Sequence, residues 1–151
     1  MTSDAHRSLE DHYRKLERMY LAAPITVWYG GIGLTISDGA AELTMAVREE
    51  FFHAAGAVHG SIYFRALDDS AFFAAASRST DTFVLTVSFH LNLTRPVTKG
   101  TLLARGRVVH ESGRLIVAES ELVDGEGRLL AKGSGTFSRS KIPLTPEIGY
   151  R

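Results

Sequence analysis

The sequence contains no cysteine, which excludes disulfide bonds, thiolate nucleophiles and zinc or iron–sulfur sites built on cysteine. Its 17 basic and 17 acidic residues leave no net charge, whereas a sequence-independent nucleic-acid binder needs a basic surface. It also lacks a long hydrophobic run: the longest near the start, 19–29, is too short to span a bilayer and is broken by Pro24. The charged residues ahead of that run include several acids, unlike a secretory signal. We therefore expect a cytoplasmic protein that binds neither nucleic acid nor membrane.

The chain is long enough for one domain with its own core, and we expect that domain to span 1–151. The stretch 58–77 is its centre, because it contains good helix formers, no proline and one glycine near its start. Apolar residues cover most of its helical circumference, so the helix is expected to be buried nearly all round. It nevertheless carries two adjacent carboxylates, Asp68 and Asp69, at its middle. An unpaired buried charge costs several kcal/mol, so at least one of the two should lie in a solvated site.

Before this stretch, four apolar or aromatic residues recur at helical spacing: Leu9, Tyr13, Leu16 and Tyr20. They predict an amphipathic helix over about 8–22 that ends before Pro24. His6 and His12 fall on or beside its polar portion, where solvated surface histidines are expected rather than metal ligands. The tail, 141–151, contains two prolines and is expected to be irregular.

Six segments have the apolar pattern of strands and are separated by turn residues. They cover 32–36, 41–47, 83–93, 102–110, 115–123 and 128–137. The clearest is 83–93, whose apolar and polar residues alternate over eleven positions. Gly133 and Gly135 in the last segment predict a bulge or strong curvature. The order of elements predicts an α+β fold, in which a curved antiparallel sheet of five or six strands wraps one long helix.

The head of the central helix carries a spaced motif. Gly56 precedes His59 by three residues, Gly60 follows His59 directly, and Asp68 lies nine residues beyond His59. This pattern resembles the hotdog thioesterases of the phenylacetic-acid-degradation type, in which Asn, Gly, His-Gly-Gly and Asp recur at these spacings. The resemblance covers about residues 30–140, and it implies a hotdog fold and thioester hydrolysis.

The resemblance continues through 85–87, Arg95-Pro96 and Lys99-Gly100, which are similar to the family's third strand and the turn after it. Two positions depart from the pattern. His53 occupies the usual asparagine position, and an imidazole can donate a hydrogen bond but with a different reach. Ser61 replaces the second glycine, which is a mild change in the first turn of a helix.

The chemistry of thioester hydrolysis needs a donor for the developing oxyanion and a group that activates water. A helix that begins near His59-Gly60 offers free backbone N–H groups and the positive end of its dipole. Asp68 lies about 13 Å further along the axis, too far to meet the start of its own helix easily. The resemblance implies that each site lies between two subunits, so we expect a homodimer or a dimer of dimers, without metal or redox cofactor.

The candidate catalytic residues, partly carried over by the resemblance, are Asp68, Gly60, His53, His59 and Thr86. The candidate substrate-binding residues are Ser61, Asp69, Arg95 and Lys99. The polar candidates have structural alternatives. Asp68 could be a buried carboxylate hydrogen-bonded to its surroundings, and His59 an orienting group at the helix start. His53 could be an ordinary loop residue, and Thr86 a polar strand residue. Arg95 and Lys99 could bind the phosphates of coenzyme A or lie on a solvated face.

The two aspartates are distinguished by spacing. Asp69-Ser70-Ala71-Phe72 resembles a local Asp-Thr-Ala-Phe stretch of the family, whereas the distance from His59 selects Asp68. Aligning Asp69 would insert a residue into a helix and rotate all later side chains by about 100°. We therefore assign the catalytic role to Asp68. Asp69 is expected to pair with a basic side chain or to accept a hydrogen bond from another residue of the site.

The function predicted is hydrolysis of an acyl-CoA or acyl-carrier thioester to free acid and thiol. The alternative is a non-catalytic module that binds acyl-CoA with the same fold. A hotdog dehydratase would need its own His–Asp motif, which we do not find in the sequence.

Overall fold

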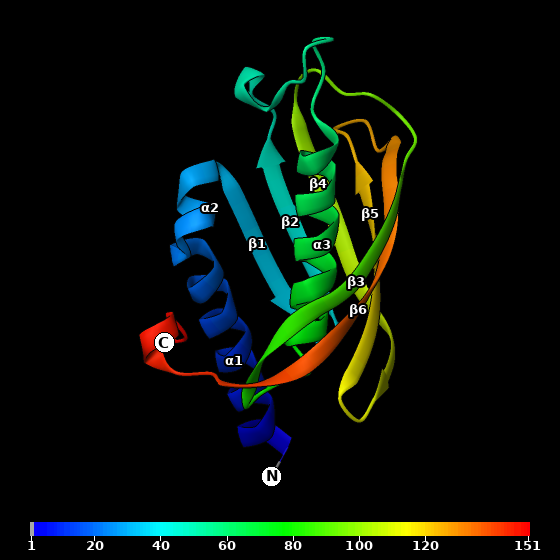
Figure 1. Cartoon of the computed structure of the whole chain (residues 1–151). Helices are drawn as coiled ribbons and strands as arrows, with labels where there is room; N and C mark the ends of the chain where they lie inside the picture. Colours follow the sequence, from blue (N-terminus) through cyan, green and yellow to red (C-terminus); the bar gives the residue numbers. More distant parts are fainter. Residues whose placement is uncertain (1) are drawn as a thin grey trace.

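The computed structural model describes residues 2–151 and has the predicted hotdog architecture, with a six-stranded antiparallel sheet curled round one long helix (Figure 1). The helices are α1 (Thr2–Ala22), α2 (Pro24–Tyr29) and α3 (Gly60–Ala76), and the short 3₁₀ helices are η1 (Glu49–Phe51) and η2 (Pro146–Ile148). The strands are β1 (Ile32–Ser37), β2 (Ala40–Ala46), β3 (Thr82–Leu93), β4 (Thr101–Ser112), β5 (Leu115–Val123) and β6 (Leu129–Pro143). Their order across the sheet is β1-β2-β4-β5-β6-β3.

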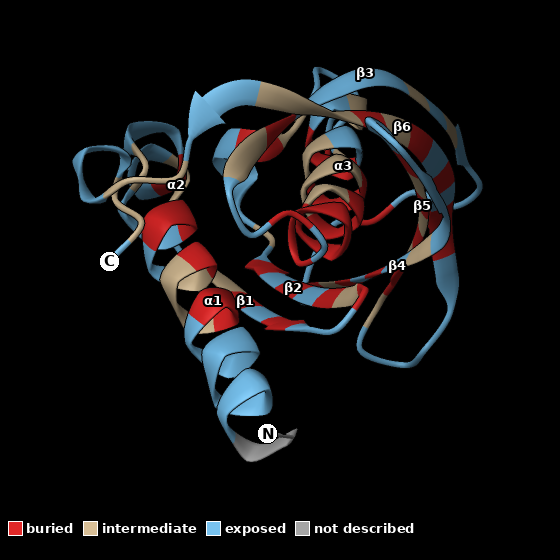
Figure 2. Ribbon diagram, turned by 90° about the horizontal axis from the view of Figure 1, so that it is seen from below, coloured by how far each residue is buried: buried red, intermediate tan, exposed pale blue. Residues whose placement is uncertain are grey.

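The central helix α3 lies inside the curl of the sheet, as its all-round apolar surface predicts (Figure 2). Small residues on it allow the strands to come close: Ala66, Ala71 and Ala74 have no exposed surface. At one point the approach is closer than any side chain permits. A Cβ added to Gly106 of β4 would lie 2.1 Å from the backbone oxygen of Ser70. Contact between the helix backbone and the sheet therefore depends on a glycine at position 106.

The two edge strands of the sheet, β1 and β3, have different neighbours. The β1 edge packs against α1, whereas among residues 2–151 β3 pairs only with β6, which leaves its other side free. Leu85, Val87 and Leu93 on β3 are between 46% and 61% exposed. A long edge strand with apolar side chains is a template for pairing with another strand.

Of the two features predicted at Gly133 and Gly135, a bulge or strong curvature, the bulge is wrong. Pairing of β6 with both neighbours runs in regular register through these residues. The glycines instead make room for the ring of Phe89, because a Cβ at either position would lie 2.5 Å from a ring carbon. The register shifts of β3 and β6 occur elsewhere, between Thr82 and Val84 and between Thr86 and Ser88.

The N-terminal helix is longer than predicted and is followed by a second one. α1 begins at Thr2 rather than near residue 8, and it ends at Ala22 as expected. Pro24 does not end helical structure, because it occupies the first position of α2, where its missing N–H costs no hydrogen bond. α1 and α2 thus form a corner (Figure 1), in which α1 packs on β1 and its Tyr20 ring contacts Phe73 of α3.

The prediction of a solvated His12 is wrong, since its side chain is buried. His12 Nδ1 lies 2.7 Å from the Tyr150 hydroxyl, and His12 Nε2 lies 3.2 Å from the Ala76 carbonyl oxygen. Burial lowers the pKa of His12 below its usual value. The tail, which includes Tyr150, is also more regular than expected. β6 runs to Pro143, and η2 follows it. Contacts between residues this far apart in the chain cannot be inferred from the local pattern around His12.

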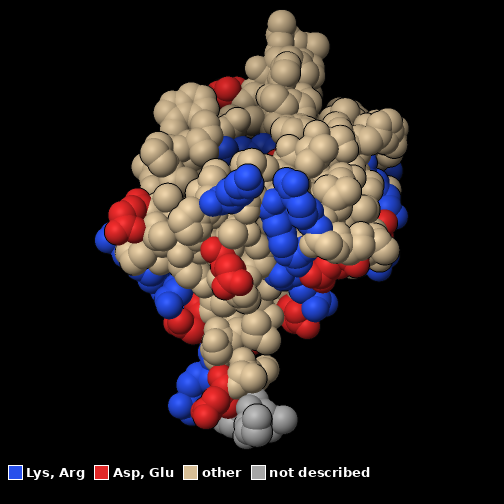
Figure 3. Space-filling model, turned by 60° about the horizontal axis from the view of Figure 1, so that its bottom comes forward, with Lys and Arg blue, Asp and Glu red and all other residues tan. Residues whose placement is uncertain are grey.

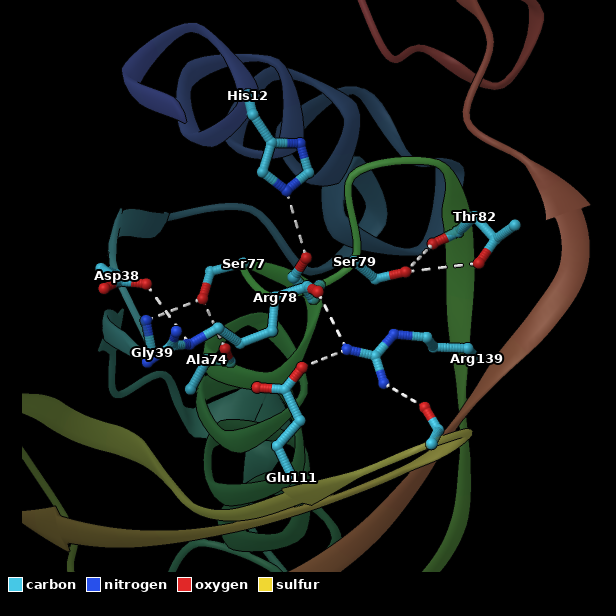
Figure 4. A network of polar contacts seen from close by, with 12 residues as sticks. His12, Asp38, Gly39, Ala74, Ser77, Arg78, Ser79, Thr82, Glu111 and Arg139 are labelled. Carbon is cyan, nitrogen blue, oxygen red and sulfur yellow. Dashed lines mark hydrogen bonds and ion pairs between the residues drawn. The ribbon is translucent and has the colours of Figure 1, made fainter. Parts of the chain in front are cut away.

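Polar contacts fix the C-terminal end of α3 (Figure 4). The Ser77 hydroxyl donates to the Ala74 carbonyl at 2.7 Å and accepts from the Gly39 amide at 2.9 Å, which joins the helix to the β1–β2 turn. Arg139 of β6 donates to the Arg78 carbonyl at 3.0 Å. The end of the helix is therefore held both by the β1–β2 turn and by β6.

Charges of both signs are distributed over the surface. On the face drawn in Figure 3, basic side chains gather near the middle with acidic ones beside them. On the sheet, Arg105 pairs with exposed Glu42 at 3.3 Å, and exposed Arg107 pairs with half-buried Glu119. Among residues 2–151, no helix is long and apolar enough to cross a membrane.

Candidate active site

Asp68 lies at the middle of α3 with its carboxylate directed toward β3. The Thr86 hydroxyl of β3 donates a hydrogen bond to Asp68 Oδ1 at 3.2 Å. Burial, followed by the neighbouring charge of Asp69, raises the pKa of Asp68 to about 6, while the Thr86 hydrogen bond opposes that shift. The structure therefore brings together two of the predicted site residues and gives the carboxylate the proton affinity of a base that works near neutral pH.

Asp69 points in a different direction, as expected for the next residue of a helix. The Tyr20 hydroxyl of α1 donates to Asp69 Oδ2 at 2.7 Å, and the Arg65 Nε lies 3.2 Å from the same oxygen. Arg65 also donates to the Thr26 hydroxyl at 3.0 Å, and its guanidinium lies 4.3 Å from the ring centre of Tyr29. Asp69 thus pairs with a basic side chain and connects α1 and α2 to the central helix.

The start of α3 has the features of an anion site. His59 is the N-cap residue, and its Nδ1 accepts from the Ser61 amide at 3.1 Å and lies 2.8 Å from the Ser61 hydroxyl. The amide of Gly60 has no hydrogen-bond acceptor within residues 2–151. A Cβ added to Gly60 would lie 3.8 Å from Leu93 Cδ2, so this amide sits beside the end of β3. A free N–H at the positive end of a helix can donate to a developing oxyanion.

His53 lies in the loop that leads to this helix start. Its amide donates to the Ala57 carbonyl at 2.9 Å, and its Nδ1 accepts from the Ala55 amide at 3.1 Å. Gly56 completes the turn with a φ of +84°, a conformation that favours glycine. The imidazole is exposed, and in the part of the chain that the structure describes no hydrogen bond joins it to Asp68 or Thr86. The hydrogen bonds described for His53 therefore all lie within its own loop.

Arg95 and Lys99 lie in the loop between β3 and β4, near the start of α3. The loop is attached there because the Tyr63 hydroxyl donates to the Arg95 carbonyl at 2.8 Å and the Val58 amide donates to the Val97 carbonyl at 3.0 Å. Both basic side chains are exposed, and neither forms an ion pair within residues 2–151. Their charges are consequently available to an anionic ligand that approaches the helix start.

The partners of Asp69, Tyr20 and Arg65, were not predicted from the sequence. Arg65 could have been found, because it precedes Asp69 by four residues on the same helix face. Tyr20 could not, since it lies on α1 and its spacing indicated only an apolar face. A cleft that opens beside Asp68 and Thr86 was also unpredicted, because its walls come from segments at opposite ends of the chain.

Comparisons with known proteins place the chain in a family. Residues 55–131 match the family model described as the thioesterase superfamily. A protein of Sulfurisphaera tokodaii, named as a candidate esterase, is 31% identical over 102 residues, which cover 68% of this chain and 76% of the relative. A conserved protein of Pseudomonas aeruginosa is 27% identical with a TM-score of 0.75, over 82% of this chain and 98% of its own.

The Escherichia coli PaaI protein, from the phenylacetic acid degradation operon, is 21% identical with a TM-score of 0.81, over 90% of this chain and 98% of its own. At that identity the likeness concerns the fold alone. The family match covers the start of α3, both aspartates, β3 and the loop with Arg95 and Lys99. From the family match and the relative in S. tokodaii together, we conclude that this chain belongs to the thioesterase superfamily and has its hotdog fold.

Proposed function

We propose that the protein hydrolyses thioesters of coenzyme A or of an acyl carrier to a free acid and a thiol. The observation that carries the proposal is the Asp68 carboxylate, which accepts a hydrogen bond from Thr86 and has a pKa raised to about 6. A carboxylate with that pKa is ionised at neutral pH and is a stronger base than an ordinary aspartate. Membership of the thioesterase superfamily supports the choice of reaction.

In the proposed reaction, Asp68 takes a proton from a water molecule as the water oxygen attacks the thioester carbonyl carbon. The carbonyl oxygen becomes an oxyanion and accepts a hydrogen bond from the free amide of Gly60. When the carbon–sulfur bond breaks, the thiolate leaves and takes up the proton held by Asp68. Thr86 orients the carboxylate and the water, and His59 keeps the helix start in position by capping it.

The site is completed by a second copy of the chain. Gly60 lies beside Leu93 at one end of β3, whereas Asp68 lies beside Thr86, seven positions earlier on that strand. Antiparallel pairing of two β3 edges, about a twofold axis near residues 89 and 90, sets Thr86 of one copy opposite Leu93 of the other. Gly60 of one copy then faces Asp68 of the other. The free edge and exposed apolar side chains of β3 support this dimer.

The remaining candidate residues have supporting roles at the same place. The exposed imidazole of His53 would provide a side-chain donor for the carbonyl, in the position where the family has asparagine. Arg95 and Lys99 would bind the phosphates of the carrier group, because their charges are unpaired within the described chain and phosphate favours basic side chains. Ser61 lies next to the Gly60 amide and would contact the substrate as it enters.

A panel of acyl-CoA and acyl-carrier thioesters, assayed for thiol release, tests the reaction. We expect turnover of at least one class of acyl group, with rates that differ by more than tenfold between acyl groups. Binding of acyl-CoA without release of thiol for any member of the panel would overturn the proposal. That result would leave the protein as a non-catalytic acyl-CoA-binding module.

The proposed base predicts the dependence of rate on pH. We expect kcat/KM to rise with pH through about 6 and to level off above it, because only ionised Asp68 accepts a proton. Below the inflection the rate should fall about tenfold for each pH unit. The measurement is initial rates of thiol release in constant-ionic-strength buffers at subsaturating substrate.

The Asp69→Asn variant is the matched test of that assignment. Removing the charge of Asp69 removes one cause of the raised pKa of Asp68, so the inflection should move to lower pH while the plateau rate remains within a few fold. The variant should lose some stability, because Arg65 loses its partner carboxylate, but the new amide oxygen can still accept the hydrogen bond from the Tyr20 hydroxyl. An inflection that stays at the same pH would show that another group titrates.

The shared site predicts that activity depends on the dimer. Val87→Asp places a charge on the free β3 edge, and we expect a monomer whose kcat/KM is lower by at least about a hundredfold, the usual effect of losing an oxyanion donor. Light scattering gives the mass and thiol release gives the rate. Val109→Asp is the control, because Val109 is also exposed but lies on the interior strand β4. A monomer with full activity would refute the shared site.

A further inference from the structure

A cleft of about 750 Å³ opens beside Asp68 and Thr86. One wall is the corner between α1 and α2, including Ala22 and Ile25, and the floor is α3. The C-terminal segment, including Ile148, also lines the cleft and crosses beside α1 (Figure 1). This volume is in the range of sites that enclose a drug-sized ligand. The cleft extends well beyond what a water molecule and a thioester group require.

The lining of the cleft is largely apolar. Phe72 and Phe73 of α3 and Phe83 of β3 contribute aromatic surface. Ile25 and Ile148 also line it and are 53% and 39% exposed, so both retain apolar surface that a ligand would cover. Covering such surface is the main source of affinity for an apolar ligand.

The charges in the cleft select against an anionic ligand. Asp68, Asp69 and Glu147 supply three carboxylates, whereas Arg65 is the one basic residue among the described residues that line it. Arg65 is already paired with Asp69 and stacked on Tyr29. A carboxylate carried into the cleft by a ligand would therefore meet like charge and no free cation.

The C-terminal segment that lines the cleft is fixed to α1 by specific contacts. The Tyr150 hydroxyl is paired with buried His12 of α1 at 2.7 Å. Gly149, with a φ of +92°, packs closely on α1, since a Cβ there would lie 3.4 Å from the Met19 backbone. The backbone of η2 is closed by the Gly149 amide, which donates to the Pro146 carbonyl at 3.0 Å. These contacts hold Ile148 in place over the cleft.

We propose that this cleft holds the acyl chain, and that the substrates are thioesters of bulky, apolar, uncharged acyl groups. Ala22 and Ile148, which both line the cleft, set the size of the chain that fits. The proposal rests on the proposed function, because it places the thioester carbonyl at Asp68 and the chain beyond it. It assigns a specificity role to the α1–α2 corner and to the C-terminal turn.

The first test compares acyl groups on the wild-type protein. We expect kcat/KM to be at least about a hundredfold higher for decanoyl-CoA than for acetyl-CoA, because burial of each added methylene is favourable. The kcat/KM for octanoyl-CoA should be about a hundredfold or more higher than that for a thioester of equal length with a carboxylate at the far end of its acyl chain. Among the described residues, the cleft has no unpaired cation for that carboxylate. Equal rates for the members of either pair would overturn the proposal.

The second test narrows the cleft. Ala22 is exposed at the end of α1, so Ala22→Phe adds a ring to the cleft without disturbing the core. We expect the ratio of kcat/KM for decanoyl-CoA over butanoyl-CoA to fall at least about tenfold, as for a pocket that loses room for several methylenes. The control is Ala5→Phe, because Ala5 is also exposed on α1 but does not line the cleft.

A binding measurement separates this inference from the proposed function. The thioether S-decyl-coenzyme A cannot be hydrolysed, and calorimetry should show that Ala22→Phe weakens its binding at least about tenfold while Ala5→Phe does not. Such weakening without any thioester turnover would retain the cleft as the acyl site and reject hydrolysis. Turnover with an unchanged chain-length ratio and unchanged binding in Ala22→Phe would reject the cleft and retain hydrolysis.

Discussion

Asp68→Asn should lower kcat by about a hundredfold or more, which is the usual cost of losing a general base. The amide cannot take a proton from water, but its carbonyl oxygen can still accept the hydrogen bond from Thr86. We therefore expect the variant to fold and to dimerise as the wild type does. The measurement is kcat for thiol release on the best substrate of the panel, with stability followed in urea to establish that only chemistry has changed.

Asp69→Asn is the matched control for this substitution, since it makes the same chemical change one residue away. It should retain turnover within a few fold at neutral pH, because Asp69 is bound to Tyr20 and Arg65 and faces away from Thr86. The opposite result, with Asp69→Asn inactive and Asp68→Asn active, would transfer the catalytic role to Asp69. It would also show that the spacing from His59 had selected the wrong carboxylate.

Gly106→Ala should destabilise the fold by about 3 kcal/mol or more, a large part of the net stability of a domain of this size. The new Cβ would lie 2.1 Å from the Ser70 oxygen and 2.6 Å from the Ala71 nitrogen. Both atoms belong to the backbone of α3, so no side-chain rotation relieves the overlap, and the helix must move away from β4. The measurement is the free energy of unfolding in urea.

Gly125→Ala is the control for the loss of glycine flexibility itself. Gly125 lies in the β5–β6 turn, where nothing lies within 4 Å of an added Cβ and the backbone is not left-handed. We expect its stability to stay within about 0.5 kcal/mol of the wild type. Equal midpoints for Gly106→Ala and the wild type would mean that α3 and β4 do not approach as closely as the structure indicates.

Local patterns were sufficient for most of the fold. The all-round apolar surface of 58–77 predicted a buried helix, and α3 occupies Gly60–Ala76. Apolar segments between turn residues predicted the fifth strand as 115–123, where β5 is found, and located the others within a few residues except for the end of β6. These signals are reliable because the spacing of apolar residues along the chain determines whether an element is buried on one face or on all faces.

The sequence by itself determined the central helix, the six strands, the hotdog class and the spacing of Gly60 and Asp68, because each depends on residues near one another in the chain. Only the tertiary structure decided what surrounds the two carboxylates. Tyr20 reaches Asp69 from α1, Thr86 reaches Asp68 from β3, and the cleft joins the first helix to the last turn. Burial, hydrogen-bond partners and pKa depend on such long-range contacts, and one position along a helix is enough to give adjacent aspartates different surroundings.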